Sequence, residues 1–310
     1  MAEILLSLTI IGVVAAITLP SLTGNINERT WNTQRKALYA RFSQAVALMP
    51  SLNGYGTLTE DESGSIEDTA AETFITSGLS KVLKINNICD NDHLEDCGIP
   101  SKMTDVLGSQ INVPKKISEL NSLNTNMSWS TEAFIGSYSF IDSKAAAFET
   151  QNGESILAYY NPNCQGNMQE SDYYYIAPKI CANFIYDLNG NKGPNTVGKD
   201  IGIMSILYPS DSLVVAPMPY LRNAGIQVNF SEAAEKCTEM DPEYRAPNLG
   251  ELASMFYNMK LIRLSSGAHH WSTTRYDSNT AWVVSTSTGR AIKSEINKSE
   301  SYNIVRCVKR

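Results

Sequence analysis

The sequence has few of the residues on which metal-centred and thiol chemistry depend. Its 310 residues include only three histidines, and its six cysteines form no Cys-x-x-Cys pair, so the main signatures of a zinc site and of thioredoxin-like chemistry are missing. A Gly-x-Ser-x-Gly motif, a phosphate-binding loop and a His-Glu-x-x-His motif are also absent. We therefore do not expect an enzyme.

The chain also lacks a dense run of Lys or Arg. Its formal net charge is −7 and its pI is near 5.1, whereas phosphate binding needs clustered basic side chains. A nucleic-acid partner is therefore not expected. The apolar content of 43% is that of a folded protein, and the length suits two globular domains.

One long uncharged apolar run lies at the start of the chain. Ile4 to Leu19 carry no charge, Glu3 stands directly before them, and Pro20 ends them. The run is slightly shorter than the roughly 20 residues that cross a bilayer as a helix. A cleaved secretory signal is not favoured, because a basic segment and a small-x-small cleavage site are both missing. The run predicts a membrane-compatible helix.

This helix is expected to continue past Pro20 with a different character. Pro20 removes a backbone hydrogen bond and should kink the helix where its two halves meet. We predict one helix over residues 1–50, apolar first and amphipathic second. The apolar positions of the second half are Leu38, Phe42, Val46 and Met49.

Glu3, the apolar run, Gly12 and Pro20 together resemble the N-terminal region of type IV pilins and type II secretion pseudopilins. In that family a leader peptide is cut after a glycine, the new N-terminal residue is methylated, and the glutamate comes four residues after the new terminus. Met1 stands where the family usually has an apolar residue. We therefore expect the leader and the first mature residues to lie upstream of this chain.

The resemblance implies a role for the glutamate. A carboxylate that faces lipid unpaired is costly, but in a filament of packed helices Glu3 can meet the N-terminal ammonium of a neighbouring subunit. Glu3, Gly12 and Pro20 are thus the implied assembly residues, and other pilin subunits are the implied partners. The implied location is the inner membrane before assembly. A plain membrane anchor, with Glu3 at the headgroup level, is the alternative.

A globular head is predicted over residues 51–208, after the composition changes to Gly, Ser, Thr and Asp. A short helix is expected near residues 69–83, and short β-branched or aromatic runs farther on predict an antiparallel sheet. An even number of cysteines suits disulfides in an oxidising compartment. Cys89 and Cys97 can bridge a small acidic loop, which we expect to be solvated. Cys164 and Cys181 bracket one of the strand-like runs, and we expect a disulfide between them to hold it.

One stretch of this head reads as a strand, an Asn-Gly turn, a Gly-Pro-Asn loop and a second strand. An EF-hand is excluded, because Lys192 stands where that motif needs glycine and Gly198 where it needs the bidentate acid. The stretch is similar to a strand-turn-strand of pilin-like proteins, some of which bind calcium in a comparable loop. Asp187, Asn189 and Asp200 are therefore candidate Ca²⁺ ligands, and no other cofactor is expected. The favoured alternative is that they satisfy turn backbone groups.

Residues 209–220 contain three prolines and predict a linker, with a further domain over residues 221–310. Ser231 is expected to cap a first helix. Asn248 and Glu251 form a capping-box pattern ahead of a second helix. Strand-like runs follow, so the expected order is helix, helix and then sheet.

The segments AAEKC, YRAPNLGELASMFYN, HHWSTT, TAWVV and NIVRCV resemble the C-type-lectin-like domain at the end of some bacterial adhesins and fimbrial subunits. The resemblance implies a Cys237–Cys307 disulfide, which would remove roughly 4 kcal/mol of unfolded-state entropy. The sugar-binding triplets of calcium-dependent lectins are missing, so that chemistry is not carried over. The same fold class includes formylglycine-generating enzymes, and this alternative requires both thiols to be free.

A possible ligand surface in this last domain is built from aromatic and imidazole side chains, for a glycan or a protein. The candidates are His269, His270, Trp271 and Tyr276. The alternative, which we favour for Trp271 and Trp282, is that they belong to the core.

The predicted fold class is α+β, with a long N-terminal pilin helix packed on a small antiparallel-sheet head, followed by a C-type-lectin-like α+β domain. The predicted function is that of a minor or tip subunit of a type IV pilus, in a periplasmic or extracellular filament after assembly, with a lectin-like module for adhesion or surface recognition. The alternative is a type II secretion pseudopilin whose C-terminal domain contacts secreted cargo.

Overall fold

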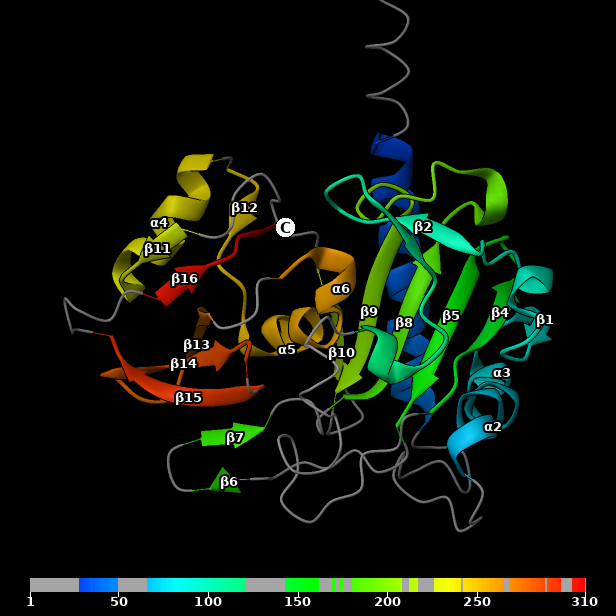
Figure 1. Ribbon diagram of the computed structural model, residues 1–310, viewed down its shortest axis with the longest axis horizontal. Coiled ribbons are helices and arrows are strands. Elements are labelled where there is room, and N and C mark those ends of the chain that lie inside the picture. Colours follow the sequence, from blue (N-terminus) through cyan, green and yellow to red (C-terminus); the bar gives the residue numbers. More distant parts are fainter. Residues whose placement is uncertain are drawn as a thin grey trace, which may run out of the picture. The chain divides into compact units, whose positions relative to one another are not determined.

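The computed structural model describes twelve stretches of the chain. The chain forms two compact units, residues 1–40 and residues 41–310. In the first unit the described residues are helical, and the helix continues to residue 48 in the second unit. Figure 1 gives the arrangement of the helices and strands. The described stretches are 28–49, 66–120, 143–161, 169–170, 173–175, 180–207, 212–216, 226–240, 242–264, 268–287, 289–296 and 303–309.

A six-stranded sheet forms one half of the second unit, and all of its strands pair antiparallel. From β4 onward its strands follow in chain order, except that β6 and β7, which come between β5 and β8 in the chain, belong to the second sheet. The β-branched and aromatic runs predict an antiparallel sheet of this kind. In sheet order its strands are β1 (Ile85–Cys89), β4 (Ala146–Thr150), β5 (Ser155–Tyr160), β8 (Ile180–Asp187), β9 (Ile201–Leu207) and β10 (Ser212–Ala216).

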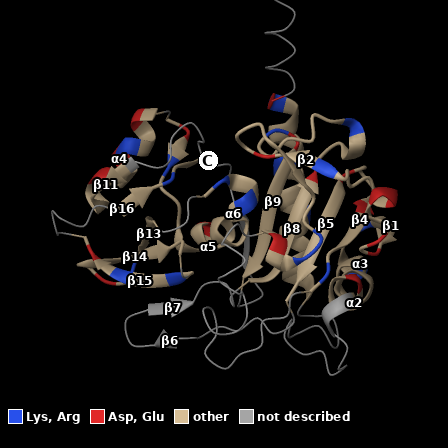
Figure 2. Cartoon of the chain, viewed as in Figure 1, with Lys and Arg blue, Asp and Glu red and all other residues tan. Residues whose placement is uncertain are grey.

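Both faces of this sheet are covered. Every residue of β5, β8 and β9 is buried, whereas an antiparallel sheet with one wet face alternates apolar and polar residues. Figure 2 agrees with this burial, because these central strands carry almost no charged residues, which are drawn in blue and red. β9 carries no charged residue and β8 carries only Asp187.

The end of the N-terminal helix packs on one face of the sheet through aromatic rings. Phe42 lies 5.3 Å from Phe184 in an edge contact and 6.3 Å from Phe148 in a stacked one. Directly before Phe42, the Arg41 guanidinium pairs with the buried carboxylate of Glu154 in the β4–β5 turn. The same face is covered by α2 (Ile66–Thr73) and by the π-helical turn Phe74–Leu79 that follows it.

Helix α5 (Leu249–Tyr257) covers the opposite face, followed by α6 (Met259–Ile262). It contacts β8, β9 and β10 of the six-stranded sheet and also β13 and β14 of a second sheet, and Figure 1 shows it between them. Polar groups fix the contact with the first sheet. Asn183 and Asn258 exchange amide hydrogen bonds at 2.9 Å, and the hydroxyls of Ser205 and Ser254 lie 2.7 Å apart.

The second sheet has seven strands and draws them from distant parts of the sequence. Only β13 and β16 pair in parallel, and the other neighbours are antiparallel. In sheet order they are β11 (Ile226–Val228), β16 (Asn303–Val305), β13 (His269–Arg275), β14 (Thr280–Ser285), β15 (Arg290–Glu295), β7 (Tyr173–Tyr175) and β6 (Gln169–Glu170).

Helix α4 (Phe230–Met240) packs against β11, β13 and β16 of this sheet. Its Cys237 forms a disulfide with Cys307, whose sulfur is 2.07 Å away, just before β17 (Val308–Lys309). β17 pairs with β12 (Tyr244–Arg245). The expected second-helix cap is confirmed, because the Asn248 side chain accepts from the Glu251 N–H and the Glu251 carboxylate accepts from the Asn248 N–H.

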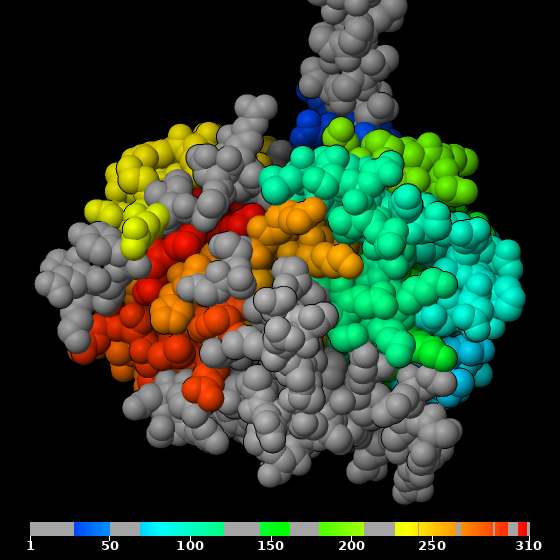
Figure 3. Space-filling view, viewed as in Figure 1, coloured from blue at the N-terminus to red at the C-terminus, as the bar shows by residue number. Residues whose placement is uncertain are grey.

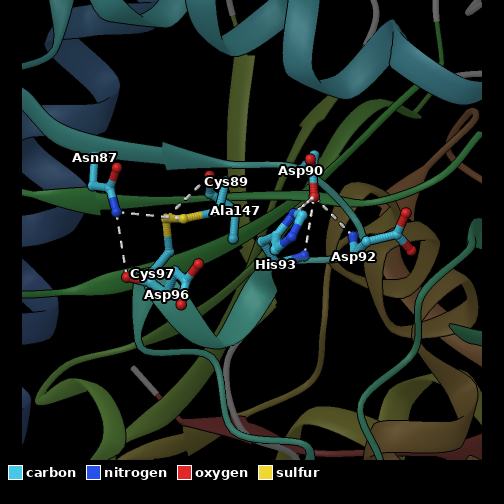
Figure 4. The surroundings of a disulfide bond; sticks show 8 residues. All are labelled: Asn87, Cys89, Asp90, Asp92, His93, Asp96, Cys97 and Ala147. Atoms are coloured by element: carbon cyan, nitrogen blue, oxygen red, sulfur yellow. Dashed lines mark hydrogen bonds and ion pairs between the residues drawn. A yellow bond between two sulfur atoms is a disulfide. The ribbon is translucent and has the colours of Figure 1, made fainter.

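A second disulfide joins Cys89 and Cys97 around a short acidic loop, which ends in the 3-10 turn η3 (Leu94–Cys97). Figure 4 shows the Asp90 carboxylate turned toward His93, whose Nδ1 lies 2.8 Å from it. This hydrogen bond lowers the pKa of Asp90 and raises the pKa of His93. Cys181 is also disulfide-bonded, while Cys164 lies outside the described residues.

The hairpin of β2 (Lys102–Thr104) and β3 (Gln110–Asn112) closes the core beside α6. The fully buried Asp105 accepts from the backbone N–H groups of Leu107 and Ser109 and from Arg263 Nε at 2.6 Å. In the space-filling view the orange residues of α6 lie directly against this part of the chain (Figure 3).

The fold class predicted from the sequence is wrong. The molecule is mixed α and β and mostly sheet, and its first sheet is not small, since it has six strands with both faces buried. No separate lectin-like domain follows it, because α5 and one hydrophobic core join both sheets and residues 41–310 form one compact unit. Two features were missed. Residues 212–216 of the expected linker form β10, and β6 and β7, which lie in the expected head, extend the second sheet.

The helix contact with the sheet can be measured by substitution. Phe42→Ala should lower the free energy of unfolding by about 3–5 kcal/mol, because it removes a fully buried ring from the cluster with Phe148 and Phe184. Leu48→Ala, on the same helix but 54% exposed, should change it by less than about 1 kcal/mol. Urea unfolding followed by circular dichroism gives both values, and equal losses would contradict this packing.

Candidate functional site

The predicted assembly residues Glu3, Gly12 and Pro20 lie outside the described residues, as does the apolar run between them. Within the described stretches, none of the helices is both long and apolar enough to cross a bilayer. The remaining candidates lie in two places, the β8–β9 connection and the second sheet.

In the β8–β9 connection the three predicted ligands lie at the two ends of one loop. Asp200 is fully buried and holds the loop backbone, since Oδ2 accepts from the Asn195 N–H at 2.8 Å and Oδ1 from the Thr196 N–H at 2.9 Å. Asp187 Oδ1 accepts from the Asn189 N–H at 3.1 Å. These bonds are the turn-stabilising contacts that Asp makes in loops.

The hydrogen bonds nevertheless leave three buried oxygens of this loop without a partner. They are Asp187 Oδ2, Asn189 Oδ1 and Asn195 Oδ1. The amide of Asn189 has a defined orientation, because its Nδ2 donates to Gly193 O at 2.8 Å. Buried oxygens are rarely left unsatisfied in folded proteins, so each one calls for an explanation. Asn195 was not predicted from the sequence, and its left-handed backbone, with φ of 50°, is the feature that marks it.

Burial raises the pKa of Asp187 to about 7, and the charge of Asp200 adds to this. A cation beside the carboxylate would reverse the effect. Among the described residues, no three His, Cys, Asp or Glu side chains lie together as a metal site. A cation here would therefore be held by one carboxylate, amide oxygens and backbone oxygens. Such hard oxygen ligands fit Ca²⁺ rather than zinc or copper.

The structure does not bring the four predicted ligand-surface residues together. Trp271 is 1% exposed and donates from Nε1 to Val228 O at 2.9 Å, as its core interpretation predicts. His270 is fully buried. His269 and Tyr276 are exposed, but they lie at opposite ends of β13, about 20 Å apart for seven extended residues. Tyr276 packs edge-on against Trp282, with the Lys293 ammonium 3.9 Å from its ring centre.

His270 is buried beside Arg306, and neither ring nitrogen of His270 has a hydrogen-bond partner in the described structure. Burial lowers the pKa of His270 to about 3, and the charge of Arg306 adds to this. The imidazole is therefore neutral in the folded protein at any pH above this value. Its role among these contacts is that of a core side chain.

A pocket of about 540 Å³ lies between the start of α4 and β13. Sequence reasoning found only Trp271 among its lining residues, because the walls come from segments up to 67 positions apart. Its other walls are Asn229, Phe230, Ser231, Ala233, Ala234, Ala246, Ser272, Thr273, Arg275 and Ile296.

Comparisons with protein-family models and with curated proteins gave no match.

The buried His270 makes stability depend on pH. The unfolded imidazole takes up a proton near pH 6.5 and the folded one only near pH 3, so acid favours the unfolded state between these values. In the wild type the free energy of unfolding should fall by up to about 1.4 kcal/mol for each pH unit below 6.5, and His270→Leu should remove this dependence. Urea unfolding at several pH values measures the slope. His269→Gln should keep the wild-type slope, and parallel profiles for wild type and His270→Leu would contradict this assignment.

Proposed function

We propose that the chain is a subunit of a type IV pilus-like filament, held in the inner membrane before assembly. The uncharged run behind Glu3, with Gly12 and Pro20, supports a helix that packs among copies of itself. The observation that carries the proposal is that the described helix runs on to residue 48 and its Phe42 is buried on the six-stranded sheet. A displayed unit needs an attachment of this kind to the end of a filament-core helix.

The part of the chain after residue 226 is proposed to serve surface recognition. It carries a pocket that the core does not fill. A large displayed unit suits a minor or tip subunit, because every copy of a major subunit must find room on the filament surface. Adhesion to a glycan or a protein surface is the recognition we propose.

Incorporation into filaments tests the proposal. The full-length gene with its upstream region is expressed in its host, and sheared filaments are probed with antibody and by immunogold electron microscopy. Glu3→Ala should lower incorporation about tenfold or more while membrane levels stay unchanged, because the carboxylate no longer meets a neighbouring ammonium. Glu28→Ala, on the exposed part of the helix, is the matched control. Normal assembly of Glu3→Ala would contradict the proposal.

A pseudopilin of a type II secretion system is the second candidate, with secreted cargo as the partner of the C-terminal part. The oxygen-lined β8–β9 loop favours it, since some pseudopilins bind calcium in a comparable loop. Deletion of the gene separates the two candidates. Loss of long surface fibres supports the pilus subunit, and a block in protein secretion with fibres intact supports the pseudopilin.

We propose in addition that the β8–β9 loop binds Ca²⁺ through Asp187, Asn189 and Asn195, with Asp200 holding the loop. Calcium should raise the Tm of the full chain. At a concentration of about 100 times the Kd, the stabilisation is about 2.7 kcal/mol. Asp187→Asn should abolish the shift, whereas Asp90→Asn, in the disulfide loop, should keep it. An equal Tm in calcium and in chelator would exclude the site.

A further inference from the structure

The pocket beside α4 has one charged wall, and its other described walls are apolar or neutral polar. Arg275 is the only charged side chain among the described residues that line it. Ala233, Ala234 and Ile296 give it apolar surface, and none of its described walls is acidic. The hydroxyls of Ser231 and Thr273 already donate within the protein. A ligand that fits this lining therefore has a negative charge and a largely apolar body.

The Arg275 guanidinium is held in a way that leaves its donors usable. It lies over the ring of Phe230, 5.2 Å from the ring centre. Stacking uses the face of the guanidinium, while its N–H groups point outward in the guanidinium plane. Nη1 has a long hydrogen bond of 3.5 Å to Ser278 O, and no carboxylate of the described residues forms an ion pair with Arg275.

The start of α4 lies at the same place, and its first turn carries Glu232, whose carboxylate accepts from the Asn229 N–H at 3.4 Å. The Asn229 side chain accepts from the Glu232 N–H at 3.0 Å, and the Asn229 carbonyl accepts from the Ala233 N–H at 3.2 Å. These two hydrogen bonds do not use the N–H groups of Phe230 and Ser231. Both residues line the pocket. The N-terminal end of an 11-residue helix favours an anion.

The two aromatic rings of the pocket are engaged by neighbouring side chains. Trp271 is 1% exposed, and it makes an edge contact with the half-buried Phe230 at 5.4 Å between ring centres. The guanidinium of Arg275 covers the ring of Phe230. A neutral sugar is commonly held by stacking on an open aromatic face, and the buried Trp271 does not offer one.

We propose that this pocket binds a carboxylate carried on a compact apolar body, either the C-terminal residue of a peptide or a small free carboxylic acid. The carboxylate takes the planar fork of Arg275, and the apolar body lies against Ala234 and Ile296. The volume of about 540 Å³ holds a group of this size. The inference rests on the recognition role proposed above, but its test needs no filament.

Titration calorimetry of the full chain tests this with N-acetyl-L-leucine and with the peptide acetyl-Gly-Gly-Leu, both with free carboxylates. The expected result is binding of at least one, weakened about tenfold or more in the matching amides. Binding of the peptide alone assigns the ligand to peptide C-termini, and equal binding of both assigns it to small acids. Binding of neither, or equally tight binding of N-acetylneuraminic acid, would overturn the proposal.

Variants place the binding in the pocket. Arg275→Gln should weaken it about tenfold or more, and Arg275→Lys should weaken it less, because an ammonium keeps the charge without the fork. Ala234→Leu, at an exposed wall, should block binding by filling the pocket. The control is Lys236→Gln, which removes a cation from the same helix outside the pocket. An equal loss in Lys236→Gln would assign the binding to general charge and overturn the proposal.

Discussion

The burial of α5 between two sheets is the constraint on which the rest of the structure depends. All residues from Glu251 to Tyr257 are buried, so the helix has no face for solvent. Its polar groups find partners on the first sheet, through Asn258 with Asn183 and Ser254 with Ser205. Without either sheet, apolar surface of α5 would be exposed to water, at a free-energy cost of about 25 cal/mol per Å². The two sheets are therefore expected to fold as one unit, although they lie far apart in the sequence.

The structure contains buried polar groups of two kinds, those with complete hydrogen bonding and those with oxygens left unpaired. The network of Asn183, Ser205 and Asn258 is hydrogen-bonded throughout, which fixes a single arrangement of helix and sheet. The β8–β9 loop instead leaves oxygens of Asp187 and Asn189 without partners. A complete network serves packing, and an incomplete one has capacity left for a ligand. This contrast is why calcium is proposed for the loop and not for the network.

The sequence predicted local features well and global ones poorly. The cap of Asn248 and Glu251 and the strands on either side of the Asn-Gly turn depend on neighbouring residues, and the structure confirms both. The first helix of the last region begins two residues earlier than expected, because Asn229 rather than Ser231 provides the cap.

The fold class was wrong for a physical reason. Strands buried on both faces carry no alternation, so nothing in β8 or β9 indicates what covers each face. The pairing of β7 with β15 joins positions more than 100 residues apart, and no local pattern encodes it. The pocket was missed in the same way, since α4, β13 and Ile296 meet only in the folded chain. Asp187 and Asn189 could be predicted because they lie in one loop.

Native-state hydrogen exchange tests most directly whether both sheets form one core. The account predicts that the slowest amides of β8 and of β14 exchange through the same opening, with free energies equal within about 1 kcal/mol. Exchange of β13, β14 and β15 at a much lower free energy, while β8 and β9 keep their protection, would contradict it. That result would show that α5 belongs to the first sheet alone and that the second sheet folds as a separate domain.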